Sequence, residues 1–131
     1  MTAAATFALT RIGQIRIPVR DLARAVRFYR DTLGMRFLFE VPGMAFFDCG
    51  GVRLMLGAPE GAAPEGPASL LYYAVPDIVA AHAALRERGA AFVDEPHLIA
   101  RMPDHELWMT FLKDSEDNLL GLMSEVRHAA A

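Results

Sequence analysis

The sequence predicts an α+β fold in which two copies of a β-strand, an α-helix and three further β-strands (βαβββ) curl about a shared cleft. Residues 14–34 (QIRIPVRDLARAVRFYRDTLG) and 70–89 (LLYYAVPDIVAAHAALRERG) both begin as an apolar strand and continue as an Asp, a helix and a Gly. At the other end of each half, DCGGVRLML from Asp48 aligns without a gap with DSEDNLLGL from Asp114. One such module exposes too much apolar sheet to stand alone, so we expect the two to share a core, with the helices outside.

The first module is predicted over residues 11–57. Residues 12–19 alternate as a strand, and Asp21 is a suitable N-cap for the helix that follows. The apolar residues of that helix recur on one face, and Gly34 is the expected C-cap. Glycines then separate three predicted strands, at residues 35–40, 44–49 and 52–56.

The second module is predicted over residues 69–126, after a Pro- and Gly-rich linker at 58–68, and the whole chain, 1–131, is read as a single domain. A strand at 69–75 leads to an N-cap at Asp77 and to a helix that ends at Gly89. The remaining elements are then assigned in order: a strand beginning at 91–93, an irregular or partly extended segment at 94–104, and strands at 105–113 and 118–125.

Composition and charge exclude several classes of function. The chain is 53% hydrophobic with a formal charge of −3 and shows no basic stripe, so we expect no nucleic-acid partner. No apolar run approaches the roughly 18 residues that span a bilayer, so we expect no membrane partner. Cys49 is the only cysteine, which excludes an intrachain disulfide and a thiolate metal cluster. The N-terminal MTAAATFALT lacks the features of a secretory signal, and we expect a cytoplasmic protein.

Two segments resemble a known family. IGQIRIPVRDLARAVRFYRDTLGM, from Ile12, resembles the opening of the vicinal oxygen chelate superfamily, which contains the glyoxalases, the bleomycin-resistance proteins and the extradiol dioxygenases. DSEDNLLGL resembles the terminal DPDGNxxEL strand of that family, with a different turn. The resemblance implies paired βαβββ modules that form an open eight-stranded barrel-like sheet around a cleft, and a homodimer.

In metal-using members of this family the ligands come from the first and last strands of each module. The resemblance places these positions at Gln14, Met55, Leu70 and Gly121. Gln14 offers a carbonyl oxygen, Met55 only a soft thioether, and the other two no donor. A divalent catalytic site needs about three hard or borderline donors, so we expect no metal at the usual site and no cofactor. The remaining apolar cavity suits a small organic molecule.

Period-two alternation extends the set of residues that face the cleft. If the four family positions face it, their companions are Arg16, Arg53, Tyr72, Leu119 and Met123. The residues between them should pack under the helices: Ile15, Ile17, Leu54, Leu56, Leu71, Tyr73, Leu120 and Leu122. Arg16 and Arg53 either hold a carboxylate or phosphate or lie at strand ends and reach solvent. The set therefore indicates a neutral or anionic ligand.

Other residues allow a functional and a structural interpretation. Trp108, the only Trp, is either a stacking wall for an aromatic ligand or ordinary packing. His97 and His105 are acid/base candidates together with Tyr72, ligands of a relocated metal site with Glu106 or Asp104, or exposed loop histidines. His82 and Cys49 are interpreted as structural, and Asp94, Glu95, Glu116 and Asp117 as turn and surface acids.

The sequence thus leads to a glyoxalase- or bleomycin-resistance-like protein that has lost its divalent metal site and binds a small, partly apolar molecule. The alternative is an enzyme, a glyoxalase-type lyase or isomerase with non-standard acid/base or metal residues at Tyr72, His97 or His105. A third possibility is a partner domain whose main role is its dimer interface. The cavity is closed either within one chain or across a dimer.

Overall fold

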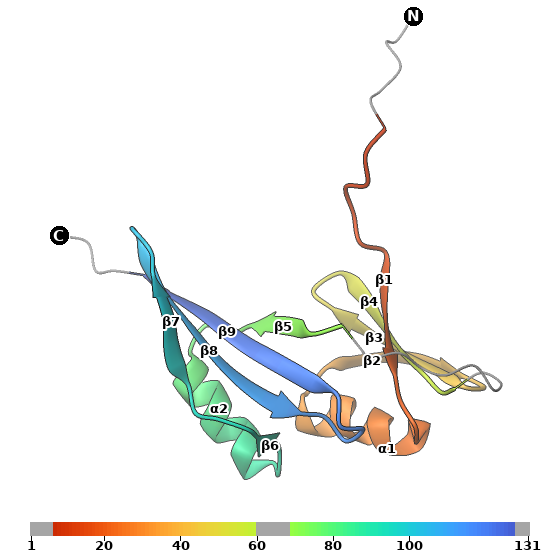
Figure 1. Cartoon of the computed structure of the whole chain (residues 1–131). Helices are drawn as coiled ribbons and strands as arrows, with labels where there is room; N and C mark the ends of the chain where they lie inside the picture. Colours follow the sequence, from red (N-terminus) through yellow and green to blue (C-terminus); the bar gives the residue numbers. More distant parts are fainter. Residues whose placement is uncertain (1–6, 60–68, 128–131) are drawn as a thin grey trace, which may run out of the picture.

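The computed structural model describes residues 7–59 and 69–127, so most of the predicted linker, 58–68, lies outside the described residues. Within them the two predicted βαβββ modules are present, each with its own sheet and helix (Figure 1). The first contains β1 (Gln14–Pro18), α1 (Leu22–Arg27), the helical turn η1 (Phe28–Thr32), β2 (Arg36–Val41), β3 (Met44–Cys49) and β4 (Val52–Gly57). The second contains β5 (Leu71–Ala74), α2 (Ile78–Glu87), β6 (Ala91–Phe92), β7 (His97–Arg101), β8 (His105–Lys113) and β9 (Leu119–Arg127).

The two sheets have equivalent strand orders. The first is ordered β1-β4-β3-β2, and the second β5-β9-β8-β6, with β7 also paired to β8. In each sheet the first strand lies parallel to the last strand of its module, and the other pairs are antiparallel. The predicted α+β fold of two modules is therefore confirmed, and the strands form two open sheets and not a closed barrel.

The first helix changes its hydrogen bonding halfway along. α1 begins after Asp21, whose side chain accepts from the backbone N–H of Arg24, as predicted. From Phe28 the chain forms a π-helical turn, in which the N–H of Leu33 donates to the carbonyl of Phe28 five residues earlier. Residues five apart come closer to alignment in a π turn than in an α-helix. Phe28 and Leu33 consequently both reach the apolar cores of the two modules.

The second module differs from the prediction at residues 94–104. This segment was expected to be irregular or partly extended, but residues 97–101 form strand β7, which pairs with β8 through a bulge between Leu98 and Ala100. The strand predicted from Ala91 is only two residues long. Between β6 and β7 the Asp94 carboxylate accepts hydrogen bonds from the Thr110 hydroxyl and the Phe111 N–H. Asp94 therefore attaches the segment between β6 and β7 to β8 through hydrogen bonds, and it is not simply a surface acid.

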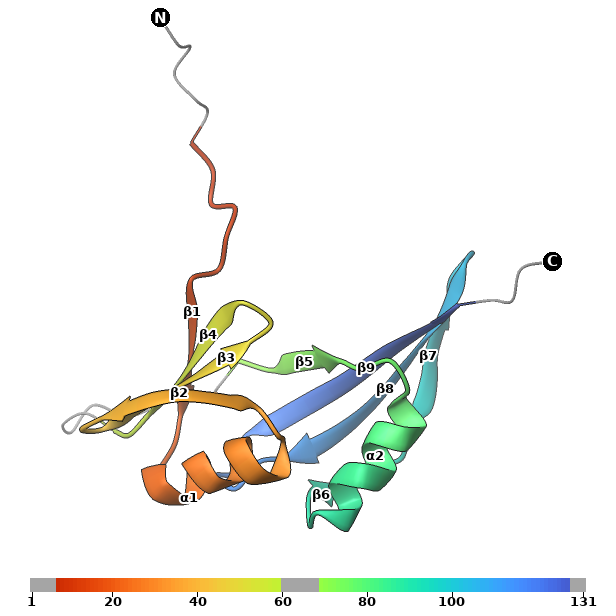
Figure 2. The ribbon, with the colours of Figure 1, turned by 180° about the vertical axis from the view of Figure 1, so that it is seen from behind.

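The cores confirm the predicted alternation. Ile17, Leu54 and Leu56 are buried in the first module, and Leu120 and Leu122 in the second. Ile15, Leu71 and Tyr73 pack against these clusters. Figure 2 shows α1 and α2 together below the two sheets. Each sheet therefore packs one face against the helices and the shared core, and no helix covers its other face.

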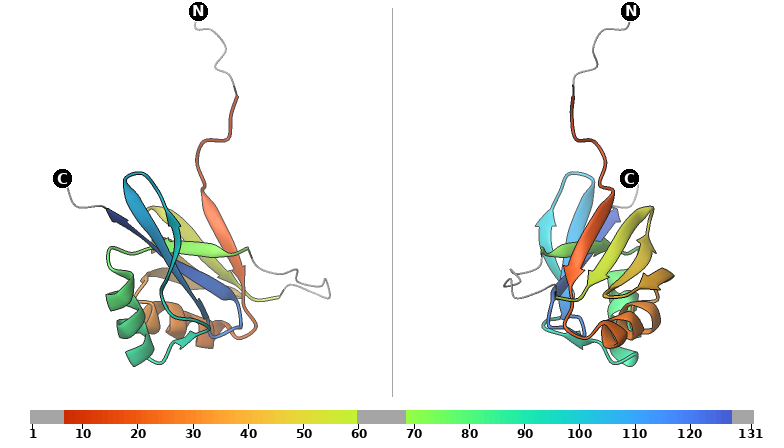
Figure 3. Two further views of the ribbon diagram at one scale, coloured as in Figure 1. Left: turned by 60° about the vertical axis from the view of Figure 1, so that its left-hand side comes forward. Right: turned by 90° about the vertical axis from the view of Figure 1, so that its right-hand side faces the viewer.

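Residues 7–13 precede β1 and extend away from both sheets (Figure 3), with Phe7 86% exposed and Leu9 91% exposed. In the described part of the chain, no helix has the length and apolar character required to cross a membrane.

Candidate ligand-binding face

Most of the predicted ligand-binding residues lie on the side of each sheet that faces away from the core, here called the uncovered face. In the first sheet it carries Gln14, Arg16, Arg53 and Met55, and in the second Tyr72, Gly121 and Met123, with Leu119 at its end. These residues alternate with the buried set along every strand. Leu119 and Tyr72 are 39% and 46% exposed, so this face is open to solvent in the single chain. A binding role for these residues stays a prediction.

Two of the four family metal positions contact each other. The Gln14 side-chain amide lies on β1 and donates to the Met55 thioether sulfur on β4, at 3.7 Å. Through this contact Gln14 directs its amide nitrogen, and not its carbonyl oxygen, toward Met55. Among residues 7–59 and 69–127 no group of three or more His, Cys, Asp or Glu residues is arranged to hold a metal ion.

The other two positions offer no donor, and one is filled by aromatic rings. A Cβ atom at Gly121 would lie 2.7 Å from Cδ1 of Tyr72 and 3.2 Å from Cε1 of Phe111. These two rings pack edge to face across the glycine, with centroids 6.0 Å apart. Leu70 precedes β5 and is 37% exposed. The residues present therefore do not fit a divalent metal, since a ligating side chain at 121 would require Tyr72 to move.

The first sheet carries a second aromatic cluster on its uncovered face. Phe39 of β2 stacks on Phe46 of β3, with centroids 4.5 Å apart and planes 24° apart. Arg53 of β4 places its guanidinium carbon 5.8 Å from the centre of the Phe46 ring, within the range of a cation–π contact. Phe46 is buried, whereas Phe39 is 44% exposed. Phe39 and Phe46 were not among the predicted ligand-binding residues, because only their cross-strand register with Met55 places them on this face.

Arg16 lies on the same face, beside the C-terminal end of β4. Its guanidinium approaches the backbone carbonyls of Gly57 and Ala58, each at 3.4 Å. A Cβ atom at Gly57 would lie 2.7 Å from Nε of Arg16, so the glycine makes room for the arginine. Arg16 is thus directed along the backbone of β4, whereas Arg53 lies over an aromatic ring.

Trp108 lies apart from the other predicted ligand-binding residues. It is on the helix-covered side of β8, in register with Ser124 and Leu98, and its indole N–H donates to the Glu106 carboxylate at 3.2 Å. It lines a pocket of about 460 Å³ at the start of α2, beside Ile78 and Val126. Side chains alternate between the two faces of a sheet along each strand. Trp108 pairs with Ser124, so it lies on the face opposite to that of Gly121 and Met123.

The two candidate histidines lie on the uncovered face but on different parts of it. His97 pairs in register with Met109, and its Nδ1 contacts the carbonyl of Glu95 at 2.8 Å. His105 begins β8, and its Nδ1 lies 2.7 Å from the Asp104 carboxylate. The hydrogen bond to His105, together with Arg127, lowers the pKa of Asp104. Tyr72 lies on β5, the opposite edge of the sheet from β7.

Glu116 was predicted to be a turn and surface acid. It does lie in a turn, but the prediction that it is at the surface is wrong. Its side chain is only 1% exposed and joins the turn between β8 and β9 to the start of α1. The carboxylate accepts from the backbone N–H groups of Arg20 and Asp21, each at 2.8 Å, and from the guanidinium of Arg24 at 2.7 Å. Burial disfavours the charged form, yet these hydrogen bonds prevail and lower the pKa of Glu116 to about 2.

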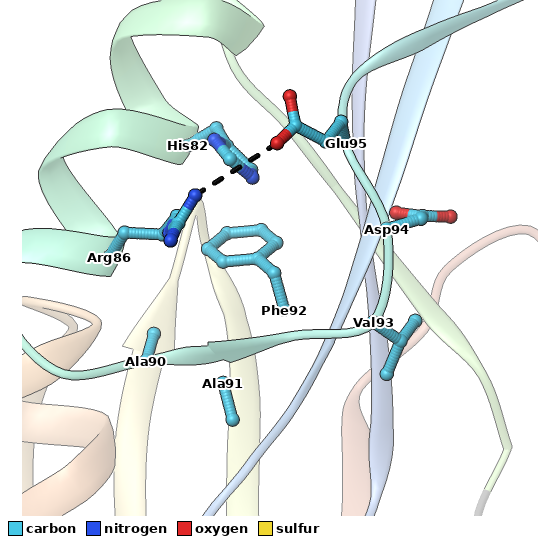
Figure 4. A pocket seen from close by; sticks show the side chains of 8 residues that line it. All are labelled: His82, Arg86, Ala90, Ala91, Phe92, Val93, Asp94 and Glu95. Carbon is cyan, nitrogen blue, oxygen red and sulfur yellow. Dashed lines mark ion pairs between the residues drawn. The ribbon is translucent and has the colours of Figure 1, made fainter.

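The remaining candidates have structural environments. His82 is 8% exposed and its ring contacts that of Phe92 at a tilt of 53°, as predicted for a residue at the border of the buried helix face. Together with Arg86 and Glu95, which pair across it at 4.0 Å, His82 lines a pocket of about 430 Å³ below α2 (Figure 4). Burial and the neighbouring Asp48 raise the pKa of Cys49, which favours the unreactive thiol.

Comparison with known proteins agrees with the resemblance. A family model described as the Glyoxalase/Bleomycin resistance protein/Dioxygenase superfamily matches residues 11–120. A glyoxalase/bleomycin resistance protein/dioxygenase from Alicyclobacillus acidocaldarius superposes with a TM-score of 0.70 at 21% identity, covering 88% of this chain and 91% of that one. A lactoylglutathione lyase from Agrobacterium tumefaciens gives 0.70 at 20%, covering 88% and 94%. TioX from Micromonospora sp. ML1 gives 0.72 at 19%, covering 89% and 100%.

At these identities the solved structures show a common fold alone. No curated protein matches the sequence.

Proposed function

Because the chain belongs to the Glyoxalase/Bleomycin resistance protein/Dioxygenase superfamily, we propose that it is a metal-independent binding protein for a small, partly apolar molecule. The ligand is neutral or anionic and lies on the uncovered face. The observation that carries the proposal is that aromatic rings replace a metal ligand at one of the four family positions: the rings of Tyr72 and Phe111 occupy the space over Gly121. A surface that offers rings in place of metal donors favours recognition by stacking.

The charge on this face supports an anionic or neutral aromatic ligand. Arg53 lies at the edge of the Phe39–Phe46 stack, so one cation and two rings are presented together. A planar ligand with a carboxylate or phosphate group would stack on Phe39 and pair with the guanidinium. A bulky cationic antibiotic does not suit this combination.

We further propose that two chains form a homodimer that closes the cavity. The aromatic clusters belong to different sheets, and both are open to solvent, with Phe39 44% and Tyr72 46% exposed. A partner chain that placed one cluster opposite the other would enclose a ligand between them and cover exposed apolar surface. Light scattering should then give twice the chain mass of 14.4 kDa.

The test is binding of 1-anilinonaphthalene-8-sulfonate, an anionic aromatic probe, followed by fluorescence. Arg53→Glu should weaken binding at least about tenfold, since it removes an attraction and adds a repulsion of like charges. Arg27→Glu makes the same charge change on the exposed surface of α1 and should leave the affinity unchanged. Equal affinity for the wild type and both variants would refute the assignment of this face.

The expected absence of a metal is tested separately, by elemental mass spectrometry of untagged protein. A divalent metal at one equivalent per chain would overturn the metal-independent proposal. Sub-stoichiometric metal that dialysis removes without changing probe binding would support it.

A second candidate function, a lyase or isomerase of the glyoxalase type, is favoured by one contact. The Asp104 carboxylate lies 2.7 Å from Nδ1 of His105 and orients that ring, an arrangement that general bases use. Its test is a lactoylglutathione lyase assay on the wild type and on His105→Ala. Turnover that this variant loses would favour the enzyme over the binding protein.

A further inference from the structure

A separate apolar pocket lies between the two modules. It has a volume of about 340 Å³ and is enclosed by the end of the first helix, by α2 and by the helix-covered side of the second sheet. Most of its wall is aliphatic, with Leu33, Leu85, Leu112, Leu120 and Leu122 contributing. A smaller cavity of about 150 Å³ adjoins it, because Cys49 and Tyr73 line both. The larger volume is within the range of small-molecule sites, roughly 300–1,000 Å³.

Tyr73 lines this wall, and its hydroxyl is itself closed off from solvent, so a ligand reaches it when a neighbouring side chain shifts. Among the described residues this hydroxyl is the one buried side-chain polar atom without a hydrogen-bond partner. Leaving a buried hydroxyl unpaired is unfavourable, and native structures usually satisfy such groups. Burial, with Cys49 and Asp114 nearby, raises the pKa of Tyr73, so the phenol keeps the proton that it can donate.

The mouth of the pocket carries balanced charge. Arg36 and Asp48 are the two charged residues of its lining. They lie opposite each other in the β2–β3 pair and in register with Arg53 of the uncovered face, so their side chains leave the leucine wall uncharged. A cation and an anion in register leave little net field to attract a charged ligand. The surroundings therefore select for a neutral molecule with a large apolar part and one hydrogen-bond acceptor.

We propose that this pocket is a second binding site, distinct from the uncovered face, for a neutral apolar ketone or aldehyde whose carbonyl oxygen accepts a hydrogen bond from the Tyr73 hydroxyl. Burial of the apolar part against the leucines supplies most of the affinity, and the hydroxyl supplies selectivity for the carbonyl. The site lies on the opposite side of β5 from Tyr72, since the two tyrosines are neighbours in the strand.

The experiment uses two probes of nearly the same shape, 2-acetylnaphthalene and 2-isopropenylnaphthalene, in which a methylene group replaces the carbonyl oxygen. Methyl-labelled full-length protein is titrated with each and followed by NMR. Both probes should shift the methyl signals of Leu85, Leu112, Leu120 and Leu122. Tyr73→Phe should weaken 2-acetylnaphthalene about fivefold, the value of one neutral hydrogen bond, and leave 2-isopropenylnaphthalene unchanged.

Tyr29→Phe is the matched control, because it removes a buried tyrosine hydroxyl that is bound to the Asp114 carboxylate and does not line this pocket. It should leave the affinity of both probes unchanged. The proposal is overturned if the pocket methyl signals do not shift, or if the two tyrosine variants affect 2-acetylnaphthalene equally. Shifts confined to Leu119 and Met123 would also overturn it, while remaining consistent with a ligand on the uncovered face.

Discussion

The two modules differ most at a pair of equivalent turns. The end of β3 and the turn after it read Asp48-Cys49-Gly50-Gly51, and the turn after β8 reads Asp114-Ser115-Glu116-Asp117. In the second turn Asp114 and Glu116 are each only 6% exposed and bind the first helix through Tyr29, Arg24 and two backbone N–H groups. In the first turn the glycines have no side chains to reach the other module, and Cys49 and Gly50 line an apolar pocket.

The difference shows how a duplicated fold becomes asymmetric. Where the turn carries acids, the joint between the modules is polar and nearly fully hydrogen-bonded. Where it carries glycines, the corresponding joint is left with a cavity and an unpaired hydroxyl at Tyr73. The hydrogen-bonded contact at Asp114 and Glu116 stabilises the packing of the two modules. The apolar cavity at the equivalent place in the first module is, as we propose, a binding site for a small molecule.

The largest difference between the modules is expected when Asp114 or Asp48, the acids at which the two equivalent segments begin, is replaced. Asp114→Ala should lower the free energy of unfolding by about 3–5 kcal/mol, since the Tyr29 hydroxyl and the N–H groups of Glu116 and Asn118 lose their acceptor. Asp48→Ala, at the equivalent position, should cost less than about 1 kcal/mol, because it removes only cross-strand charge pairing. Urea unfolding measures both, and equal losses would contradict the asymmetry.

The buried carboxylate of the polar joint should make stability depend on pH. Folding lowers the pKa of Glu116 from its ordinary 4.5 to about 2, so its contribution is complete above about pH 4.5 and is lost as the pH falls toward 2. Glu116→Gln should lower the free energy of unfolding by about 2 kcal/mol at neutral pH and flatten the curve in that window.

Asp117→Asn is the control for that experiment. Its carboxylate is 77% exposed and lies 3.5 Å from Arg20, so the change should stay within about 0.5 kcal/mol and keep the wild-type pH curve. If Glu116→Gln lost stability between pH 4.5 and 2 as the wild type does, Glu116 would not be the cause of that loss.

The two buried tyrosines should respond differently to the loss of their hydroxyl groups. Tyr29→Phe removes a donor that lies 2.8 Å from the Asp114 carboxylate and should cost about 1–2 kcal/mol. Tyr73→Phe removes a hydroxyl without a partner and should leave stability unchanged or raise it by up to about 1 kcal/mol. Thermal or urea unfolding of the pair measures the difference, and a larger loss for Tyr73→Phe would reverse our view of the two joints.

The smallest effect is expected at Asp117, which adopts a left-handed conformation with φ of 65°. The family pattern has Gly at this position. Asp117→Gly relieves the left-handed strain but gives the unfolded chain more freedom, so the two effects should cancel to within about 0.5 kcal/mol. A loss well above 1 kcal/mol would mean that the Asp117 side chain contributes more to the joint than its exposure suggests.

Much of the fold could be predicted because it rests on short-range patterns. The alternation of Ile15, Ile17 and Leu54 with Gln14 and Arg53 identified both faces of the first sheet, and Asp21 and Asp77 identified the starts of both helices. Strand β7 was missed because its pattern is interrupted by a bulge and is completed only by pairing with β8. The π turn at Phe28 could not be predicted from neighbouring residues, because it depends on the packing of Phe28 against the core of the second module.

The duplication, the family, the two faces of each sheet and the lack of suitable donors at three of the four metal positions could all be predicted from the sequence. All of these depend on residue type and on spacings of a few residues. The tertiary structure alone decided which side chains meet. Glu116 reaches Arg24 across 92 residues, and the Asn118 side chain reaches the carbonyl of Pro18 across 100.

The aromatic filling over Gly121 and the cavity beside Tyr73 were likewise invisible in the sequence. Contacts between segments so far apart depend on how the two modules pack against each other, and packing is a property of the assembled surfaces and not of any local run of residues.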